Sequence, residues 1–287
     1  MFVRRVIPAL LCCAFLAVGP AAAKSSSGDT AIRVMSFNVR LPVAQDGANQ
    51  WENRRDLAAD TIRKIAPDVI GTQELHKRQG DDLVARLPLY NWVGIDRRGG
   101  HADEHMGIFY RRDRLDLIDF GNFWLSDTPT VPGSITWGHL YPRMVTWALF
   151  ETKADRRRFY LYNTHFPYRA EDEPARLKAA QMIAERLAAL PADVPVVLTG
   201  DFNTTPDSAA HAALTATMAD AFVAAPERAG PENTFHNYTG KADRRIDWIL
   251  SRGLQARRLS TVTDHRGALQ TSDHFPVVAD LAWPEAR

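Results

Sequence analysis

The chain is almost free of cysteine. Its two cysteines, Cys12 and Cys13, both lie within residues 1–23. These residues are typical of a cleaved signal peptide, because two arginines precede a thirteen-residue apolar stretch and three alanines at 21–23 provide a small-residue cleavage site. The mature protein then has no cysteine, which excludes disulfides and thiolate catalysis and leaves the hydrophobic core as the main source of stability.

Long hydrophobic runs are also missing. The apolar stretch at 6–18 is too short to cross ~30 Å of hydrocarbon comfortably. The sequence therefore predicts a periplasmic or secreted protein with no stable membrane insertion. Residues 24–30 are rich in serine and glycine and are expected to form a flexible lead-in. No linker or repeat follows, so residues 31–284 are predicted to form a single domain.

Neither sign of charge is in excess. The chain has 35 lysines and arginines against 34 acidic residues, and removal of Arg4 and Arg5 leaves one net negative charge. Near-neutrality provides no general attraction for nucleic acid or for anionic membranes. Basic stripes with interleaved aromatics and helices with a basic amphipathic face are both absent. Overall charge therefore does not indicate the substrate class, which must be inferred from individual side chains. We also expect the protein to be a monomer.

Apolar periodicity predicts strands with interspersed helices. Strands at 32–37 and 68–71, joined by a helix at 53–64, indicate a βαβ unit. Alternating residues at 144–150 and 158–162 indicate an antiparallel hairpin. Further helices are expected at 81–87, 173–190 and 208–217. Parallel and antiparallel connections together predict an α/β fold with mixed sheets.

Polar residues follow the ends of the predicted strands. The buried strand at 195–199 ends at Gly200, and Asp201 and Asn203 come directly after it. Such a pair has an ordinary explanation, because aspartate and asparagine both favour turns and helix caps. The same pattern recurs, however, at other predicted strands. The further residues at or beside strand ends are Asn38, Glu74, His165, Asp247, Asp273 and His274.

These residue types suit metal-assisted cleavage of a phosphoester. Glu74, Asp273 and Asn38 offer the oxygen ligands that Mg²⁺ or Mn²⁺ prefers. Histidines with carboxylate partners can activate the attacking water or protonate the departing oxygen. Zinc also accepts these ligand types, but their spacing matches no compact zinc motif. His101 and His236 lie in predicted loops and are expected to be surface residues.

Six short motifs, in this order along the chain, carry a resemblance to a known family. They are Ser36-Phe37-Asn38-Val39-Arg40, Thr72-Gln73-Glu74, Asn163-Thr164-His165, Gly200-Asp201-Phe202-Asn203, Arg245-Ile246-Asp247-Trp248-Ile249 and Ser272-Asp273-His274-Phe275-Pro276-Val277. The chain resembles the endonuclease/exonuclease/phosphatase superfamily, which includes deoxyribonuclease I, apurinic endonucleases, neutral sphingomyelinases and inositol-polyphosphate 5-phosphatases. The resemblance covers residues 33–283. It implies a four-layer α/β sandwich, in which two packed mixed sheets are flanked by helices.

The resemblance also implies roles for the metal ligands and for one histidine. Glu74 corresponds to the main metal ligand, aided by Asn38 and Asp273. His274 corresponds to the histidine that acts on the attacking water or on the phosphate, and Asp247 orients it.

Further roles follow from the same resemblance. Asp201 and Asn203 would position the nucleophile and stabilise the transition state. His165 matches the second histidine of the deoxyribonuclease I branch, and Glu104 lies where that branch has the partner glutamate. Arg143 is similar to an arginine that grips the substrate phosphate, although it could also begin a strand as an exposed cation.

The chain departs from the family pattern at one position. The apurinic endonuclease branch has an aspartate two positions after the first asparagine, whereas this chain has Arg40, which could contact a phosphate. This difference and the export signal argue against abasic-site repair. The segments at 46–54 and 123–129 resemble a subgroup of exported bacterial members. Within the first of them, Trp51 and Arg54 have two interpretations: they line the substrate cleft, or they form a helix-entry staple and a solvated cation.

The sequence thus predicts an exported phosphoesterase that depends on Mg²⁺ or Mn²⁺ and cleaves a phosphodiester by in-line attack of an activated water. Alternatives are a phosphomonoesterase, a sphingomyelinase-like lipid head-group hydrolase, and an inactive binding module on the same fold. An inactive module would lack at least one site residue, and none is missing. The site residues do not separate nucleic acid, lipid head group and inositol phosphate. Specificity is expected in the loops at 41–51, 97–104, 126–142 and 228–243.

Overall fold

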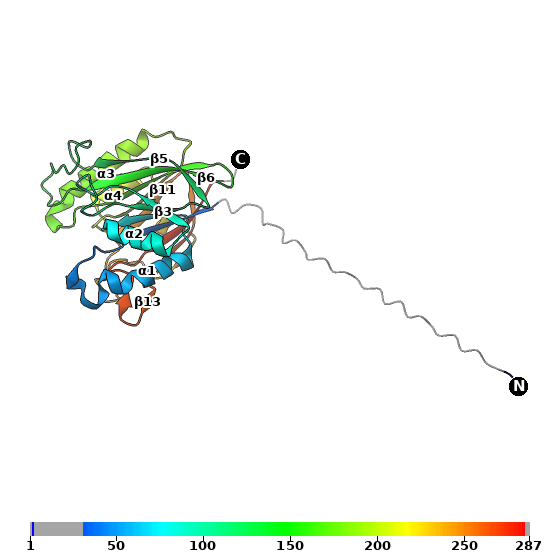
Figure 1. Ribbon diagram of the computed structural model, residues 1–287. Helices are drawn as coiled ribbons and strands as arrows, with labels where there is room; N and C mark the ends of the chain where they lie inside the picture. Colours follow the sequence, from blue (N-terminus) through cyan, green and yellow to red (C-terminus); the bar gives the residue numbers. More distant parts are fainter. Residues whose placement is uncertain (1, 3–30, 285–287) are drawn as a thin grey trace.

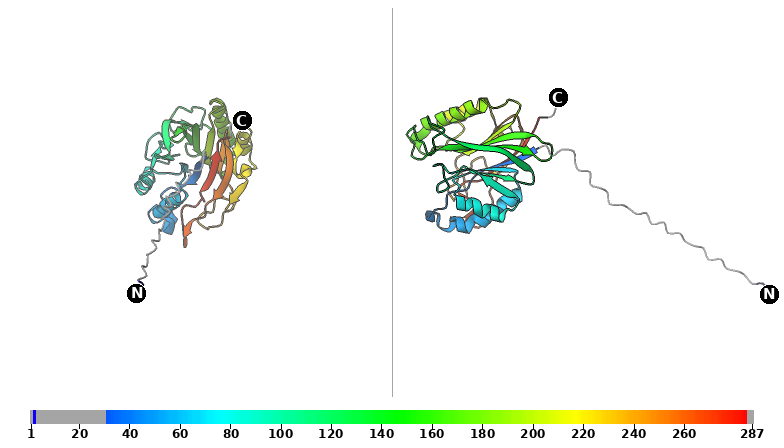
Figure 2. Two further views of the ribbon diagram at one scale, coloured as in Figure 1. Left: turned by 90° about the vertical axis from the view of Figure 1, so that its right-hand side faces the viewer. Right: turned by 45° about the horizontal axis from the view of Figure 1, so that its top comes forward.

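Two mixed β-sheets pack face to face in the computed structural model, which describes residue 2 and residues 31–284 (Figures 1 and 2). The predicted signal peptide and lead-in therefore lie outside the residues that the structure describes, apart from Phe2. The first sheet has seven strands, in the order β10 (Glu227–Ala229), β12 (Gln255–Thr261), β15 (Val277–Ala282), β1 (Ala31–Asn38), β2 (Val69–Gln73), β4 (Ile108–Arg111) and β3 (Tyr90–Val93).

The second sheet has six strands. Their order is β5 (Leu115–Trp124), β6 (Met144–Thr152), β7 (Arg158–His165), β8 (Val196–Asp201), β11 (Asp247–Arg252) and β9 (Ala219–Asp220). A separate hairpin pairs β13 (His265–Arg266) with β14 (Leu269–Gln270). Each large sheet contains both parallel and antiparallel pairs, so the predicted mixed sheets are confirmed.

Helices cover the outer face of each sheet (Figure 2). On the first sheet these are α1 (Trp51–Ile65) and α2 (Lys77–Arg86), and on the second they are α3 (Glu173–Ala188) and α4 (Ala209–Thr215). Shorter segments are η1 (Ala44–Asn49), η2 (Ala170–Asp172) and α5 (Ala221–Ala224). The four-layer α/β sandwich predicted from the sequence is therefore confirmed. Within residues 31–284, no helix has the length and apolarity needed to cross a membrane.

Strand β1 shows how the sequence builds these layers. Ile32 and Val34 belong to the core between the two sheets, whereas Met35 and Phe37 belong to the core beneath α1 and α2. Successive side chains of a strand point to opposite faces, so a strand at the centre of a four-layer sandwich is apolar on both sides. This explains why β1 has apolar residues at both even and odd positions.

Helix α2 begins earlier than the apolar pattern predicts. We expected a helix at 81–87, but it starts at Lys77. Gln79 accepts a hydrogen bond from the backbone N–H of His76 through its side-chain oxygen, at 2.9 Å. This bond satisfies a backbone donor just before the first turn. Capping by polar residues thus determines where the helix begins, and a search for apolar periodicity does not detect such a signal.

Parallel pairing brings the polar strand ends together. In the first sheet β1 runs parallel to β2, with Asn38 opposite Gln73. In the second sheet β7 runs parallel to β8, with His165 opposite Asp201. Parallel strands end at the same edge of their sheet, where ligands usually bind in α/β proteins. The predicted βαβ unit and the β6–β7 hairpin are both confirmed.

Candidate active site

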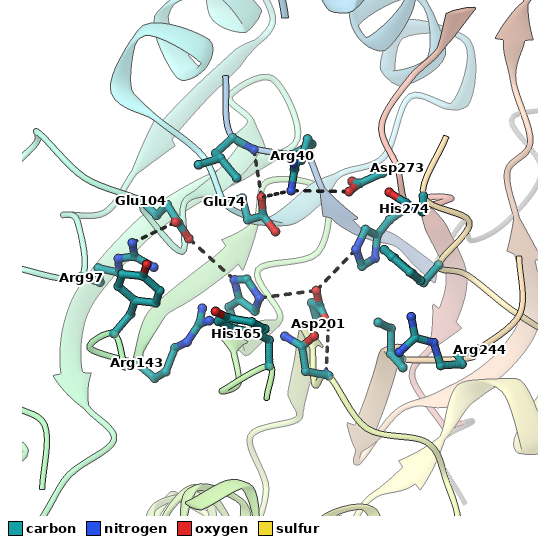
Figure 3. A pocket seen from close by; sticks show the side chains of 17 residues that line it. Arg40, Glu74, Arg97, Glu104, Arg143, His165, Asp201, Arg244, Asp273 and His274 are labelled. Carbon is teal, nitrogen blue, oxygen red and sulfur yellow. Dashed lines mark hydrogen bonds and ion pairs between the residues drawn. The ribbon is translucent and has the colours of Figure 1, made fainter. Parts of the chain in front are cut away.

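The strand ends open into one pocket of about 480 Å³ between the two sheets (Figure 3). Nine of the residues predicted for the site line it: Arg40, Glu74, Glu104, Arg143, His165, Asp201, Asn203, Asp273 and His274. Two more, Asn38 and Asp247, lie directly behind the lining and hydrogen-bond to it. The pocket lies in the size range of small-molecule sites.

Asp201 lies at the centre of this site. Its Oδ2 accepts a 2.9 Å hydrogen bond from the side-chain amide of Asn38 and lies 3.5 Å from Nε2 of His165 and 3.7 Å from Nε2 of His274. Its Oδ1 accepts the backbone N–H of Asn203 at 3.0 Å. Burial, together with the nearby Asp247 carboxylate, raises the pKa of Asp201 to about 7, against the opposing effect of His274.

The two histidines beside Asp201 differ in charge. Burial alone would lower the pKa of His274, but Asp247 and Asp201 raise it to about 10, and Asp247 Oδ2 lies 2.8 Å from its Nδ1. Burial lowers the pKa of His165 well below its usual value, and the arginines at 143 and 97 lower it further. At neutral pH, His274 is therefore an imidazolium and His165 is a neutral imidazole.

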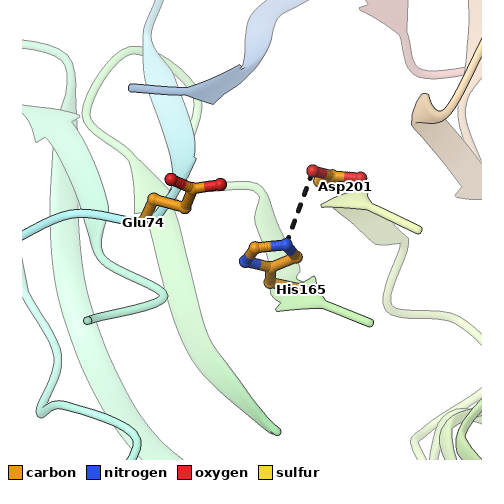
Figure 4. A group of neighbouring side chains, drawn as sticks. All are labelled: Glu74, His165 and Asp201. Carbon is orange, nitrogen blue, oxygen red and sulfur yellow. Dashed lines mark ion pairs between the residues drawn. The ribbon is translucent and has the colours of Figure 1, made fainter. Parts of the chain in front are cut away.

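Glu74 belongs to a group of donors that fits a divalent cation. Carboxylate and imidazole atoms of Glu74, His165 and Asp201 lie within 4.8 Å of one another (Figure 4). Glu74 Oε1 accepts a 3.1 Å bond from Asn38, and burial followed by the Glu74 charge raises the pKa of Asp273. Closely spaced buried carboxylates are unfavourable without a cation, and oxygen donors suit hard ions.

Asn38 bridges two of these acids through its amide nitrogen. Its Oδ1 meanwhile accepts the backbone N–H of Arg40 at 2.9 Å. The amide oxygen is thus already engaged within the protein. Direct metal ligation by Asn38 stays a prediction, whereas its role in holding Glu74 and Asp201 close together is visible in the hydrogen bonds.

Glu104 connects His165 to an arginine that the sequence did not single out. One Glu104 oxygen lies 3.0 Å from Nη2 of Arg97, and the other lies 4.0 Å from Nδ1 of His165. Burial and the Glu74 charge raise the pKa of Glu104 to about 7. The loop at 97–104 was predicted to be a specificity loop, but its position in sequence did not reveal that Arg97 points into the pocket.

Arg143 is a buried cation that lines the pocket. The residue is only 3% exposed, and among the described residues its Nη1 has no hydrogen-bond partner. Of the two interpretations from sequence, the exposed strand-start cation is therefore wrong. A buried guanidinium with a free donor is suited to binding an anionic group.

Three non-glycine residues at the strand ends adopt left-handed backbone conformations. They are Arg40, Glu74 and Asn203, with φ values of 55°, 58° and 50°, and all three line the pocket. Left-handed φ values are uncommon for such residues and tend to cluster at functional sites. Here they turn the chain at the ends of β1, β2 and β8 and direct these side chains into the pocket.

Trp51 and Arg54 do not lie in the pocket. Trp51 is 1% exposed and donates its indole N–H to Asp82 at 2.8 Å. Arg54 is fully buried and donates to four backbone carbonyls, those of Val39, Arg40, Asn49 and Thr271, at 2.7–2.9 Å. The cleft-lining prediction is therefore wrong for both residues, and so is the prediction of a solvated Arg54.

One further prediction was wrong, and two pocket residues were not predicted. His236 was expected at the surface but is 2% exposed and stacks on Phe275, with ring centroids 4.1 Å apart. Arg244 lines the pocket and lies 4.6 Å from the Phe235 ring, although neither residue was proposed. The only signal for Phe235 was its place in the predicted specificity loop at 228–243, which Arg244 directly follows.

The fold and the pocket define this chain as a phosphoesterase-type α/β sandwich. Residues 35–274 match the model of the Endonuclease/Exonuclease/phosphatase family. The chain belongs to this family, whose members are hydrolases that act on phosphoesters and generally use divalent metals.

Solved structures agree with this assignment. A family member from Bacteroides vulgatus has a TM-score of 0.83 and 32% identity, and the match covers 88% of this chain and 99% of that chain. A mannosyl-6-phosphatase from Bacteroides thetaiotaomicron has a TM-score of 0.82 and 30% identity, with 88% and 100% covered.

Three curated relatives give shorter matches. An uncharacterised protein of Acanthamoeba polyphaga mimivirus is 31% identical over 164 residues, which are 54% of this chain and 60% of that protein. The first three curated relatives are matched over only 37–60% of their own length.

We predict that Arg54→Met destabilises the protein by roughly 3 kcal/mol or more, because each buried acceptor left unsatisfied costs about 1–3 kcal/mol. Urea denaturation followed by tryptophan fluorescence measures the change. The matched control is Arg55→Met, since Arg55 is the next residue and is partly exposed, and we expect it to change stability by less than about 0.5 kcal/mol. Equal stability of the two variants would contradict a structural role for Arg54.

Proposed function

We propose that this protein is an exported phosphoester hydrolase that depends on a divalent metal and cleaves its substrate by in-line attack of water. The observation that carries the proposal is the position of the Asp201 carboxylate between a neutral and a charged histidine in an arginine-lined pocket. This arrangement offers a proton acceptor for water and cationic groups for a phosphate within a few ångströms of each other.

Asp201 is the base in this proposal. Its pKa of about 7 lies close to neutral pH, where a general base is most effective. Asn203 and Asn38 hold its two oxygens and so fix the direction from which a proton is accepted. Neutral His165, beside the same carboxylate, helps to orient the water.

His274 acts on the phosphate and not as a base. An imidazolium with a pKa near 10 does not accept a proton at neutral pH, but it stabilises negative charge that develops on phosphate oxygens. Asp247 keeps the ring charged and oriented. Arg143 adds a second cation with a free donor. Of the two roles that the sequence left open for His274, this assignment favours the phosphate.

The metal is assigned to Glu74, which belongs to the group of donors with His165 and Asp201 in the structure; Asp273 and Asn38 are the further ligands that the sequence predicts. When bound, Mg²⁺ or Mn²⁺ would supply Lewis-acid charge to the phosphate. Export is part of the proposal because the first 23 residues are typical of a signal peptide.

The sequence favoured a phosphodiester substrate, but a small phosphomonoester is a second candidate. Four arginines line the pocket, namely Arg40, Arg97, Arg143 and Arg244. Among them Arg143 has a buried donor with no partner among the described residues, which suits the extra negative charge of a monoester. A solved structure that is 30% identical to this chain is a mannosyl-6-phosphatase. Both observations favour a sugar phosphate over an extended polymer.

A substrate panel tests the proposed reaction. The panel contains plasmid DNA, bis(p-nitrophenyl) phosphate, sphingomyelin, inositol phosphates and mannose 6-phosphate, each assayed with Mg²⁺ and with EDTA. We expect turnover of at least one compound with Mg²⁺ and its loss with EDTA, because the metal supplies charge that the side chains cannot. Failure to turn over any compound with metal present, or turnover that EDTA leaves unchanged, would refute the proposal.

The role of His274 is tested by His274→Ala. Loss of one group that stabilises the transition state should lower kcat by roughly 10²-fold or more, with the fold retained by circular dichroism. His265→Ala is the control, because His265 is an exposed residue of the β13–β14 hairpin. Near-wild-type kcat in the His274 variant would remove this residue from the mechanism.

A further inference from the structure

Arg40 occupies an unusual position among the acids of the pocket (Figure 3). Its Nη1 lies 3.9 Å from Oε2 of Glu74 and 3.7 Å from Oδ2 of Asp273. The guanidinium thus faces both acids that the sequence predicts as metal ligands. Because arginine keeps its charge at every accessible pH, this positive charge is a permanent part of the site.

The other side of the guanidinium is clamped. Its Nε and Nη2 donate to the two carboxylate oxygens of Asp46 at 3.1 and 3.0 Å, and the Tyr238 hydroxyl donates to the same carboxylate at 3.1 Å. The Asp46 side chain is only 6% exposed. A two-point contact of this kind fixes the plane of the guanidinium. Only Nη1 remains directed at the acids, so Arg40 has little capacity to grip a phosphate with two hydrogen bonds.

The backbone of Arg40 is held as firmly. Its carbonyl accepts from the side chains of Arg54 and Gln79, at 2.8 Å each, and its N–H donates to Asn38. These contacts account for the left-handed φ of 55° at a residue that seldom adopts it. The buried arginine on α1 therefore has a consequence for the site, since it fixes the residue that faces the metal ligands.

The position of the fixed cation indicates what it does. Its Nη1 lies 3.7 Å from Asp273, so a divalent ion bound to that carboxylate would lie close to a guanidinium that cannot move away. Two cations at such short range repel each other strongly in a partly buried site. Glu74, by contrast, also belongs to the group of donors with His165 and Asp201, which can hold an ion.

We propose that Arg40 is the fixed second cation of this site, so that the pocket takes one divalent ion on Glu74 while Arg40 neutralises Asp273. In two-metal phosphoesterase sites, two ions about 3.5–4 Å apart together stabilise the attacking and the leaving oxygen. Here the guanidinium replaces one of them, on the side of the pocket away from His165. The inference rests on the proposed metal-dependent function.

Metal stoichiometry tests the inference without an activity assay. Mn²⁺ is titrated into the metal-free protein by isothermal calorimetry, with free Mn²⁺ followed by electron paramagnetic resonance. We expect one ion per chain for the wild type and two for Arg40→Met, because the variant leaves Asp273 without its cation. Arg40→Lys retains the charge and should bind one ion. Arg244→Met, which removes a pocket arginine that lies over Phe235, should also bind one.

Two results would overturn the role of Arg40. Two ions bound by the wild type would show that the guanidinium does not replace a metal, and this result would stand even if Arg40→Met failed to fold. One ion bound by both wild type and Arg40→Met, with equal affinity, would show that Arg40 has no influence on the metal site. Absence of any Mn²⁺ binding by the wild type would instead contradict the proposed metal-dependent function.

Discussion

The Asp201 carboxylate is the group on which the rest of the site depends. It is buried where the two sheets meet, and its neighbours come from both of them: Asn38 from the first sheet, His165 from the second, and His274 from the segment before β15. A buried carboxylate requires hydrogen bonds and compensating charge from its surroundings. The sandwich satisfies this requirement by converging strand ends, so the packing that stabilises the fold also assembles the chemistry.

Much of this arrangement could be predicted from sequence. Period-two patterns and the polar residues that follow them located Asn38, Glu74, His165 and Asp201, because strand direction alone places strand ends at one edge. Arg54 and His236 were misjudged for a physical reason. Their burial depends on groups far along the chain, such as the carbonyl of Thr271, 217 residues from Arg54. From neighbouring residues alone, arginine and histidine are expected to be exposed to solvent, because the local sequence contains no information about such distant partners.

Sequence patterns also failed to identify Arg97 and Arg244 as pocket residues. Arg97 lies on a predicted specificity loop and Arg244 directly follows another, but a loop sequence does not specify which side chain turns inward. Arg40 shows how such segments are tied to the site. Its guanidinium joins Asp46 of η1 and, through that acid, Tyr238 to the metal-facing carboxylates. The loop segments and the chemical centre are thus linked by a short series of part-buried hydrogen bonds and an ion pair.

The most direct test of this account is to measure the protonation of His274 and His165 as a function of pH. Heteronuclear NMR of metal-free protein labelled at the histidine ring nitrogens follows each imidazole from pH 5 to 10. A pKa raised in the folded state means that His274 keeps its proton through neutral pH and loses it only as the pH rises through about 10, whereas His165 stays neutral across the range. Ordinary titration of both rings near pH 6.5 would contradict the account.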